Sequence, residues 1–255
     1  MRRSISLVTD RFPGRPGFDA AVSRAVLQGV ASGDLSETLR LTVAERLVAF
    51  GSRDLANPEF PAARRAAASA GFGSYLRLAG GKAAAFHEGT IAFGWAVPSA
   101  DPRVTIEERF AEIGGILVDA LAGLGIDARV GEVPGEYCPG EHSINAGGTH
   151  KLIGIGQRLI GGAAHVGGVI VAERADLVNR ALEPVYEALG YDWEPATTGA
   201  AADHAPVTVG DLLAAVEAAF GDRHDLVPGS IDAPTLGEAA RLEAAGRGAL
   251  RARSR

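Results

Sequence analysis

Two short stretches of this chain, Glu136-Tyr-Cys138-Pro-Gly-Glu-His142 and Lys151-Leu-Ile-Gly-Ile-Gly-Gln-Arg158, decide how it is interpreted. Cys138 is the only cysteine among 255 residues, so it cannot form an intramolecular disulfide. The Pro-Gly pair that follows it predicts a turn, which places the thiol at a surface or in a cleft. Two interpretations stay open: an inert small hydrophobic residue, or a nucleophile whose thiolate is favoured by a nearby cation.

Lysine is rare in this chain, because Lys82 and Lys151 are the only two while arginine is plentiful. A single lysine is usually a solvated surface residue, but one that stands among arginines suggests a need for a compact, titratable ammonium. His142 follows Cys138 closely and could serve as a base, with an exposed loop histidine as the usual alternative. The histidines show no metal-ligand spacing, so we predict no metal site.

Composition narrows the class of protein. With 47% hydrophobic and 22% charged residues, the chain can bury the core of one large domain, or of a domain with a small appendage. The formal net charge of −6 argues against nonspecific binding to nucleic acid, which requires a basic surface. No apolar run approaches the roughly 20 residues of a membrane span, and no signal-like segment follows the first residues. We expect a cytoplasmic protein that binds neither nucleic acid nor membranes.

Apolar periodicity predicts helices and short strands in mixed order after a polar lead. The expected helices cover residues 18–30, 61–70, 105–124, 174–190, 208–220 and 234–255, and the expected strands cover 38–43, 46–50, 90–97, 128–130, 143–145, 152–153 and 169–172. A tight turn is expected to join strands 38–43 and 46–50, and the small, polar segment 195–206 is expected to be a flexible linker. Because strands and helices do not alternate regularly, this order favours an α+β sheet packed by helices over a doubly wound fold.

Three motifs in a fixed order carry a resemblance to a known family. The chain reads Arg77-x-x-Gly80-Gly81, then Tyr-Cys138-Pro-Gly, then Lys151-x-x-Gly-Ile-x-Gln-Arg158. This order resembles the lipoate-protein ligase and octanoyltransferase superfamily, which includes biotin-protein ligases, and is most similar to its cysteine-dependent octanoyl or lipoyl transferase branch. The resemblance implies a biotinyl/lipoyl protein ligase-like fold: an α+β domain with a mixed, largely antiparallel sheet packed by helices. It also implies a catalytic domain over residues 1–205 and a short helical C-terminal extension over residues 206–255.

The resemblance assigns roles to individual residues. It makes Cys138 the acyl-accepting nucleophile and Lys151 the base or cation that polarises the substrate. The substrate-binding set that it implies is Arg77, Gly80, Gly81, His87, Gly154 and Gln157. The sequence departs from the pattern of the branch at His87, where an acidic residue is common, at Ala92, where asparagine is common, and at residues 165–168. These departures bear on chain length and on the choice of acyl donor.

Three functions remain in competition. A transferase would move an octanoyl or lipoyl group from the thioester or amide of an H protein-type carrier, through an acyl-cysteine, to the lysine of a lipoyl domain, with no cofactor. An ATP-dependent lipoate-protein ligase would use ATP and Mg²⁺ to form lipoyl-adenylate. A non-enzymatic protein would bind the same carriers without catalysing a reaction.

The tail after Pro206 is short and helical, which favours the transferase. Arginines at 2, 3, 11, 15, 64 and 65 could steer an acidic carrier domain. The cargo, the carriers and the oligomeric state stay open.

Overall fold

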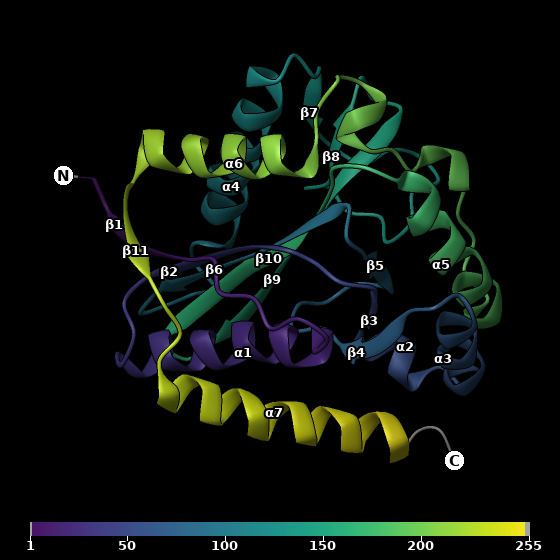
Figure 1. The fold of residues 1–255 in the computed structure, drawn as a ribbon, viewed down its shortest axis with the longest axis horizontal. Coiled ribbons are helices and arrows are strands. Elements are labelled where there is room, and N and C mark those ends of the chain that lie inside the picture. The colour runs from purple at the N-terminus through teal and green to yellow at the C-terminus, as the bar shows by residue number, and fades with distance from the viewer. Residues whose placement is uncertain (1, 253–255) are drawn as a thin grey trace.

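A computed structural model describes residues 2–252 of the chain. The strands are β1 (Ser4–Val8), β2 (Thr38–Val43), β3 (Leu47–Phe50), β4 (Gly73–Leu76), β5 (Ala84–Phe86), β6 (Thr90–Pro98), β7 (Ala128–Val130), β8 (Ile144–Ala146), β9 (His150–Ile160), β10 (Ala163–Val171) and β11 (Asp225–Gly229). Within the described residues, eight of them form a main sheet in the order β11-β1-β2-β6-β10-β9-β8-β7, and three form a small sheet in the order β4-β3-β5 (Figure 1). Pairing in the main sheet is antiparallel except between β11, β1 and β2, so the predicted largely antiparallel sheet is confirmed.

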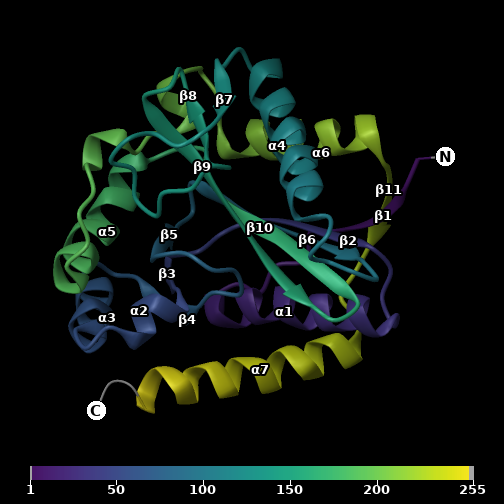
Figure 2. The same cartoon turned by 180° about the vertical axis from the view of Figure 1, so that it is seen from behind.

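Helices cover both faces of the main sheet. They are α1 (Pro16–Ser32), α2 (Ser52–Ala56), α3 (Phe60–Ser69), α4 (Ile106–Gly123), α5 (Ala175–Leu189), α6 (Val209–Arg223) and α7 (Ala233–Ala252), with 3₁₀ turns at Pro195–Thr197 and Ala201–Asp203. Helices α4 and α6 pack together on one side of the sheet, and α1 lies on the other side with α7 outside it (Figures 1 and 2). The predicted α+β sheet packed by helices is therefore confirmed. No helix within residues 2–252 is long and apolar enough to cross a membrane.

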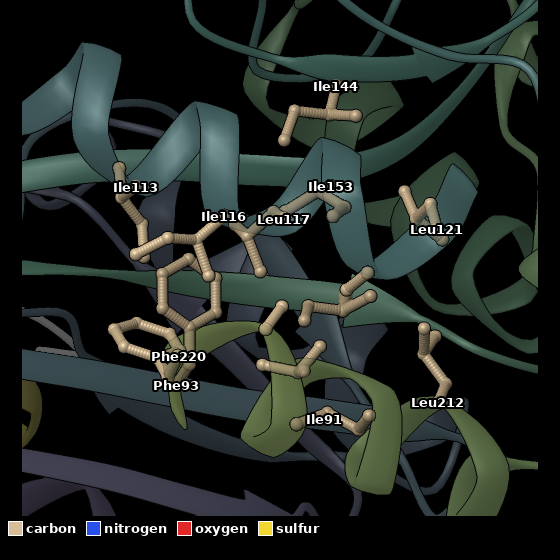
Figure 3. Packing of buried hydrophobic residues seen from close by; sticks show 14 of the residues in the cluster. Ile91, Phe93, Ile113, Ile116, Leu117, Leu121, Ile144, Ile153, Leu212 and Phe220 are labelled. Atoms are coloured by element: carbon tan, nitrogen blue, oxygen red, sulfur yellow. The ribbon is translucent and has the colours of Figure 1, made fainter. Parts of the chain in front are cut away.

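The face covered by α4 and α6 carries a large apolar core. Figure 3 shows the α4 side chains Ile113, Ile116, Leu117 and Leu121 together with Ile91 and Phe93 of β6, Ile144 of β8, Ile153 of β9, and Leu212 and Phe220 of α6. Every one of these side chains is at most 4% exposed. Complete burial of a large aliphatic or aromatic side chain stabilises a fold by about 1.5–3 kcal/mol, so this core fixes the sheet as a rigid platform.

Helix ends follow local sequence signals. Pro16 begins α1, where its missing N–H costs nothing, and Gly33 ends the helix with φ 84°. Thr208 caps α6: its hydroxyl accepts a hydrogen bond from the Asp211 N–H while the Asp211 carboxylate bonds back to the Thr208 N–H. These signals explain why the expected helices at 18–30 and 208–220 lie close to the observed ones.

The expected turn between strands 38–43 and 46–50 is wrong as a hairpin within one sheet. Both strands exist, but β2 already has β1 and β6 as neighbours in the main sheet, so no edge of it is open to β3. After Val43, the Ala44 N–H donates to the Thr90 carbonyl, and the chain enters the small sheet, where β3 pairs with β4 and β5.

The expected linker at residues 195–206 is also wrong. Thr198 forms a bridge beside Lys151, the Gly199 N–H donates to the Lys151 carbonyl at 3.0 Å, and Ala200 and Ala201 are fully buried. A Cβ on Gly199 would lie 2.6 Å from the Cβ of His150, so glycine permits this close approach. The small side chains that resemble a linker in the sequence are here the ones that allow tight packing.

The segment after residue 205 contributes a strand to the main sheet. Strand β11 pairs with β1 from Ser4↔Asp225 to Val8↔Gly229, and α7 packs against α1. The predicted C-terminal segment therefore contains a strand as well as helices, and its division from residues 1–205 stays a prediction. The polar lead, too, contains a strand, because β1 lies within it.

Candidate functional site

A cavity of about 410 Å³ lies between the main sheet, helix α1, the small sheet and the loop 137–143. Its floor includes Gly94 of β6, Gly167 of β10 and Gly156 of β9, which stand side by side in adjacent strands. A Cβ on Gly156 would lie 3.0 Å from the Cβ of Ala79, in the loop that closes the cavity above it. The glycines thus let the His165 ring lie over Gly94 and Gly167, and let the loop that carries Ala79 lie over Gly156.

Cys138 is half-buried, lines the cavity and has an unusual backbone conformation. Its φ is 43°, in the left-handed region that residues with a Cβ seldom adopt, and such strain clusters at functional sites. Two N–H groups donate to its Sγ: the backbone N–H of Lys82 at 3.2 Å and Nη1 of Arg77 at 3.6 Å. Donors of this kind stabilise negative charge on sulfur.

Gly80 and Gly81, the glycine pair beside the thiol, differ in how closely other atoms surround them. Gly81 has φ 110°, and a Cβ there would lie 2.8 Å from the Cys138 Sγ and 3.1 Å from Nη1 of Arg77. A Cβ on Gly80 would meet nothing within 4 Å. Both glycines line the cavity, but only Gly81 determines how closely the chain approaches the thiol.

Lys151 is buried and uses all three of its N–H bonds within the protein. Its Nζ donates to Glu136 Oε1 at 2.8 Å and to the carbonyls of Tyr137 and Cys138 at 2.9 Å each. The side chain is 1% exposed and the Glu136 side chain is fully buried. The ammonium therefore contacts the backbone on both sides of the thiol-bearing residue, and the cation that contacts the thiol itself is Arg77.

Glu136 is a functional-site residue that sequence reasoning missed, although it lies in the quoted stretch. Besides Lys151, its carboxylate accepts hydrogen bonds from the Val133 N–H at 3.0 Å, the Gly140 N–H at 3.2 Å and the Ser143 hydroxyl at 2.6 Å. The buried Glu136 carboxylate thus connects residues before and after Cys138 through hydrogen bonds. A carboxylate next to a predicted catalytic turn is the signal that could have found it.

Tyr186 of α5 supports the same loop from the opposite side. Its hydroxyl accepts a hydrogen bond from the Cys138 N–H at 2.9 Å and donates one to the Ala83 carbonyl at 3.0 Å. Burial, and next the neighbouring Cys138, hold the pKa of Tyr186 well above its usual value, so the phenol keeps the proton that it donates. No local motif marks this tyrosine, because it lies on a helix distant in the sequence.

Gly154 and Gln157 are two further residues of the predicted substrate-binding set. Gly154 lines the cavity, and a Cβ there would lie 3.6 Å from Cε of Lys151, an ordinary contact. Gln157 also lines the cavity, but its amide is engaged with α4: Oε1 accepts from Nε of Arg109 at 2.9 Å, and Nε2 donates to the Ile106 carbonyl at 2.8 Å. Gln157 therefore anchors a wall of the cavity.

Two histidines that were considered for the site do not contact the thiol. His87 is fully buried outside the cavity lining, where its Nδ1 accepts from the Gly89 N–H at 3.0 Å. Burial lowers the pKa of His87 to about 4. His142 lines the cavity, but its ring stacks on Phe110 at 3.8 Å and its Nε2 faces Glu107 at 3.6 Å. The structure therefore does not bring His87 into the site.

The arginine clusters are largely engaged in ion pairs. Arg2 faces Asp225, Arg3 bonds to Glu112, and Arg15 bonds to Glu243 at 3.2 Å. Arg11 is exposed and lines the cavity. It is thus the member of the N-terminal cluster that combines exposure with a place at the site.

Comparisons with known proteins indicate the family of this chain. The family model described as the lipoyl protein ligase A/B catalytic domain matches residues 15–208. An octanoyl-GcvH:protein N-octanoyltransferase of Anoxybacillus flavithermus is 28% identical over 155 residues, which cover 59% of this chain and 55% of that protein. The chain is thus aligned with about half the length of this curated relative.

Solved structures show the same fold. A lipoate-protein ligase A bound with ATP superimposes with a TM-score of 0.78 at 20% identity, covering 96% of this chain and 95% of that one. A bipartite lipoate protein ligase of Thermoplasma acidophilum, studied with its E2 lipoyl domain, gives 0.69 at 18% identity, covering 96% and 92%. Since the family model spans most of the chain, the protein belongs to the lipoyl protein ligase A/B catalytic domain family.

Proposed function

We propose that this protein is a cofactor-independent acyltransferase that moves an octanoyl or lipoyl group to the lysine of a lipoyl domain through an acyl-Cys138 intermediate. The observation that carries the proposal is the half-buried Cys138, which lines a cavity of about 410 Å³ and has two N–H donors directed at its sulfur. A ligase that activates its substrate with ATP has no need of a thiol at this place.

The proposed reaction consists of two successive acyl transfers. The Cys138 thiolate forms a C–S bond to the acyl carbon, the bond from that carbon to the carrier's sulfur or nitrogen breaks, and the carrier leaves as a thiol or amine after gaining a proton. The amine of the acceptor lysine then forms a C–N bond, the C–S bond breaks, and the amine gives up a proton as the thiol is restored.

Each neighbour of the thiol has a distinct part in this proposal. Arg77 and the Lys82 N–H stabilise negative charge at the sulfur and beside it, where the tetrahedral intermediate forms. Lys151 and Glu136 hold the strained turn so that Sγ faces the cavity. Lys151 thus acts mainly by positioning, in place of the direct cationic contact expected from the sequence.

The partners follow from the relatives. The curated relative is named for an octanoyl-GcvH donor, and a structural neighbour was solved as part of a system with its E2 lipoyl domain. A glycine-cleavage H protein-type donor and a lipoyl-domain acceptor are therefore the partners to test first. Arg11, exposed at the cavity, is a candidate contact for an acidic carrier domain.

The test is acylation without nucleotide. Purified protein is incubated with an octanoyl thioester, or with octanoylated H protein, in the absence of ATP, and its intact mass is measured. We expect one acyl group, removable by hydroxylamine and absent from Cys138→Ala, followed by transfer to a lipoyl domain. If the acylated lipoyl domain forms only with ATP and Mg²⁺, and forms equally with Cys138→Ala, the ligase reaction would be established instead.

A further inference from the structure

The thiol of Cys138 lies where two separate segments of the chain meet. One segment is the turn that carries Cys138, and the other is the pair Lys82-Ala83, which directly precedes β5. The Lys82 N–H donates to the Cys138 Sγ at 3.2 Å, and the Lys82 carbonyl accepts from Nη1 of Arg77 at 2.8 Å. The contact between the thiol and its backbone donor therefore depends on how these two segments are held together.

Tyr186 of α5 joins the two segments through its hydroxyl. This oxygen accepts a hydrogen bond from the Cys138 N–H at 2.9 Å and donates one to the Ala83 carbonyl at 3.0 Å. Because Ala83 directly follows Lys82, the hydrogen bonds form a closed ring that runs from the Cys138 N–H through Tyr186, Ala83 and Lys82 back to the Cys138 sulfur. Removal of the hydroxyl should therefore change the contact between Sγ and the Lys82 N–H.

The ion pair of Lys151 with Glu136 holds a different part of the site. The side-chain hydrogen bonds of these two residues end on one another or on residues 133–143. They shape the turn itself, whereas Tyr186 connects the turn to Lys82-Ala83. Arg77 also connects the two segments, from the Lys82 carbonyl to the sulfur, but it does so through Sγ and leaves the Cys138 N–H to Tyr186.

The backbone of Cys138 requires such a restraint. Its φ of 43° lies in the left-handed region, and a residue with a Cβ keeps this conformation only where its surroundings hold it. A half-buried N–H without an acceptor would destabilise the turn further. The Tyr186 hydroxyl is the acceptor that satisfies this N–H.

The position of the Tyr186 ring is itself fixed by burial. The residue is fully buried on α5, and its ring packs against the rings of Tyr191 and Trp193 at centroid distances of 5.4 Å and 5.3 Å. Burial holds the pKa of Tyr186 well above its usual value, and the single hydroxyl proton is used by the Ala83 carbonyl. The phenol therefore has no proton to give to a substrate, which excludes it as an acid in the reaction.

We propose that Tyr186 is a positioning residue that holds the Cys138 thiol against the Lys82 N–H and thereby keeps the thiolate available for reaction. Its part in acyl transfer rests on the proposed function, whereas its effect on the thiol can be measured without an acyl donor. Because the Cys138 N–H bonds to Tyr186, the described donors left beside the sulfur for a tetrahedral intermediate are the Lys82 N–H and Arg77.

The first experiment measures alkylation of the single thiol by iodoacetamide, followed by intact mass. Iodoacetamide reacts with the thiolate, so Tyr186→Phe should react about threefold to tenfold more slowly than wild type at about pH 7, the scale of one hydrogen bond. At about pH 10, where an ordinary cysteine is largely ionised, the two proteins should react at nearly the same rate.

Two outcomes of this experiment would overturn the inference. Equal rates at both pH values would show that the hydroxyl does not act on the thiol. A slowing by the same factor at both pH values would show that it governs access to the thiol and leaves the thiolate fraction unchanged.

Tyr191→Phe is the matched control. It also removes a phenol hydroxyl from the same aromatic group, one that donates to Asp54 Oδ1 at 2.9 Å. Both variants keep their rings and should fold, with some loss of thermal stability in each. The ratio of the alkylation rates at the two pH values should change in Tyr186→Phe and not in Tyr191→Phe. The same change in both would assign the effect to general loosening of the fold and sink the inference.

Acylation separates this inference from the proposed function. With the octanoyl thioester of N-acetylcysteamine, Tyr186→Phe should lower the maximal single-turnover rate of Cys138 acylation by about threefold to tenfold, while the half-saturating donor concentration changes less than about twofold. A wild-type protein that is never acylated, with the alkylation results as expected, would remove the proposed function and leave the position of the thiol as inferred. A higher half-saturating concentration at an unchanged maximal rate would instead make Tyr186 a donor-binding residue and overturn the inference.

Discussion

Two groups of side chains around the cavity differ in how their polar atoms are satisfied. Beside the thiol, the Lys151 ammonium, the Glu136 carboxylate and the Tyr186 hydroxyl all bond to other parts of the protein. Within residues 2–252, no hydrogen bond engages the side chains of His165 and Tyr75, which also line the cavity. A site that must keep one geometry is built from groups that satisfy one another, whereas a site that recognises a ligand keeps bonds available for it.

The largest effect should come from removing the thiol. Cys138→Ala should lower acyl transfer by about a thousandfold or more, because Cys138 is the only cysteine of the chain and the variant has no thiol to carry the acyl group. Binding of free octanoic acid should change less than threefold, because the variant leaves the rest of the cavity lining in place. Intact-mass spectrometry and calorimetry check the two parts, and acyl transfer near the wild-type rate would remove the thiol from the mechanism.

The second prediction concerns the buried ion pair at the thiol end. Lys151→Met leaves the Glu136 carboxylate buried without its cation, so the free energy of unfolding should fall by about 3–5 kcal/mol, measured by urea denaturation. Acylation of Cys138 should slow about a hundredfold, because the turn that presents the thiol is released.

The double variant Lys151→Met/Glu136→Gln is the control for this pair. It removes both charges and should regain most of the lost stability while acylation stays slow. If the double variant were as unstable as the single one, burial of an unpaired charge would not be the cause.

A third prediction compares substitutions at Gly81 and Gly80. Gly81→Ala adds a Cβ 2.8 Å from the Cys138 Sγ at a φ of 110°, and should slow acylation by about tenfold to a hundredfold. Gly80→Ala meets nothing within 4 Å and is the matched control, with an expected change below twofold. Single-turnover acylation rates, with thermal unfolding as a check on folding, decide between them; equal losses would mean that the pair acts only as a turn.

The smallest effect tests the buried His165 side chain through pH. The folded-state pKa of His165 is about 4, below the ordinary value of about 6.5, so the unfolded chain binds the extra proton first. The His165 contribution to stability is therefore fully present above pH 6.5 and is lost as the pH falls toward 4, by about 1–3 kcal/mol. The difference in unfolding free energy between wild type and His165→Leu isolates this term. A difference that does not vary between pH 7.5 and pH 4.5 would contradict it.

Sequence reasoning located the elements whose ends carry local signals and missed those decided by distant contacts. The helix capped at Thr208 was found from its own residues, whereas β1 and β11 exist because each pairs with the other. In β11, Pro228 and Gly229 resemble a turn, yet proline, which has no backbone N–H to donate, is tolerated here because β11 is an edge strand with a partner on one side only.

For the site, the sequence identified residues but not their orientations. Arg77, Gly81, Cys138 and Lys151 do meet around one loop, as the motif order predicted. The direction of the Lys151 ammonium depends on Glu136 and on two carbonyls that only the folded loop brings within reach. His87 belonged to the substrate-binding set that the resemblance implied, but it follows β5 and lies outside the cavity lining.

The pairing of β1 with β11 also constrains the time course of folding. Residue 4 must find residue 225, so this edge of the main sheet can close only after nearly the whole chain has been synthesised. Contacts between residues so distant in sequence slow folding, and helix α7, which covers α1, follows β11 in the chain. During synthesis, the thiol-bearing loop and the floor glycines are complete in sequence before β11 and α7 have been made.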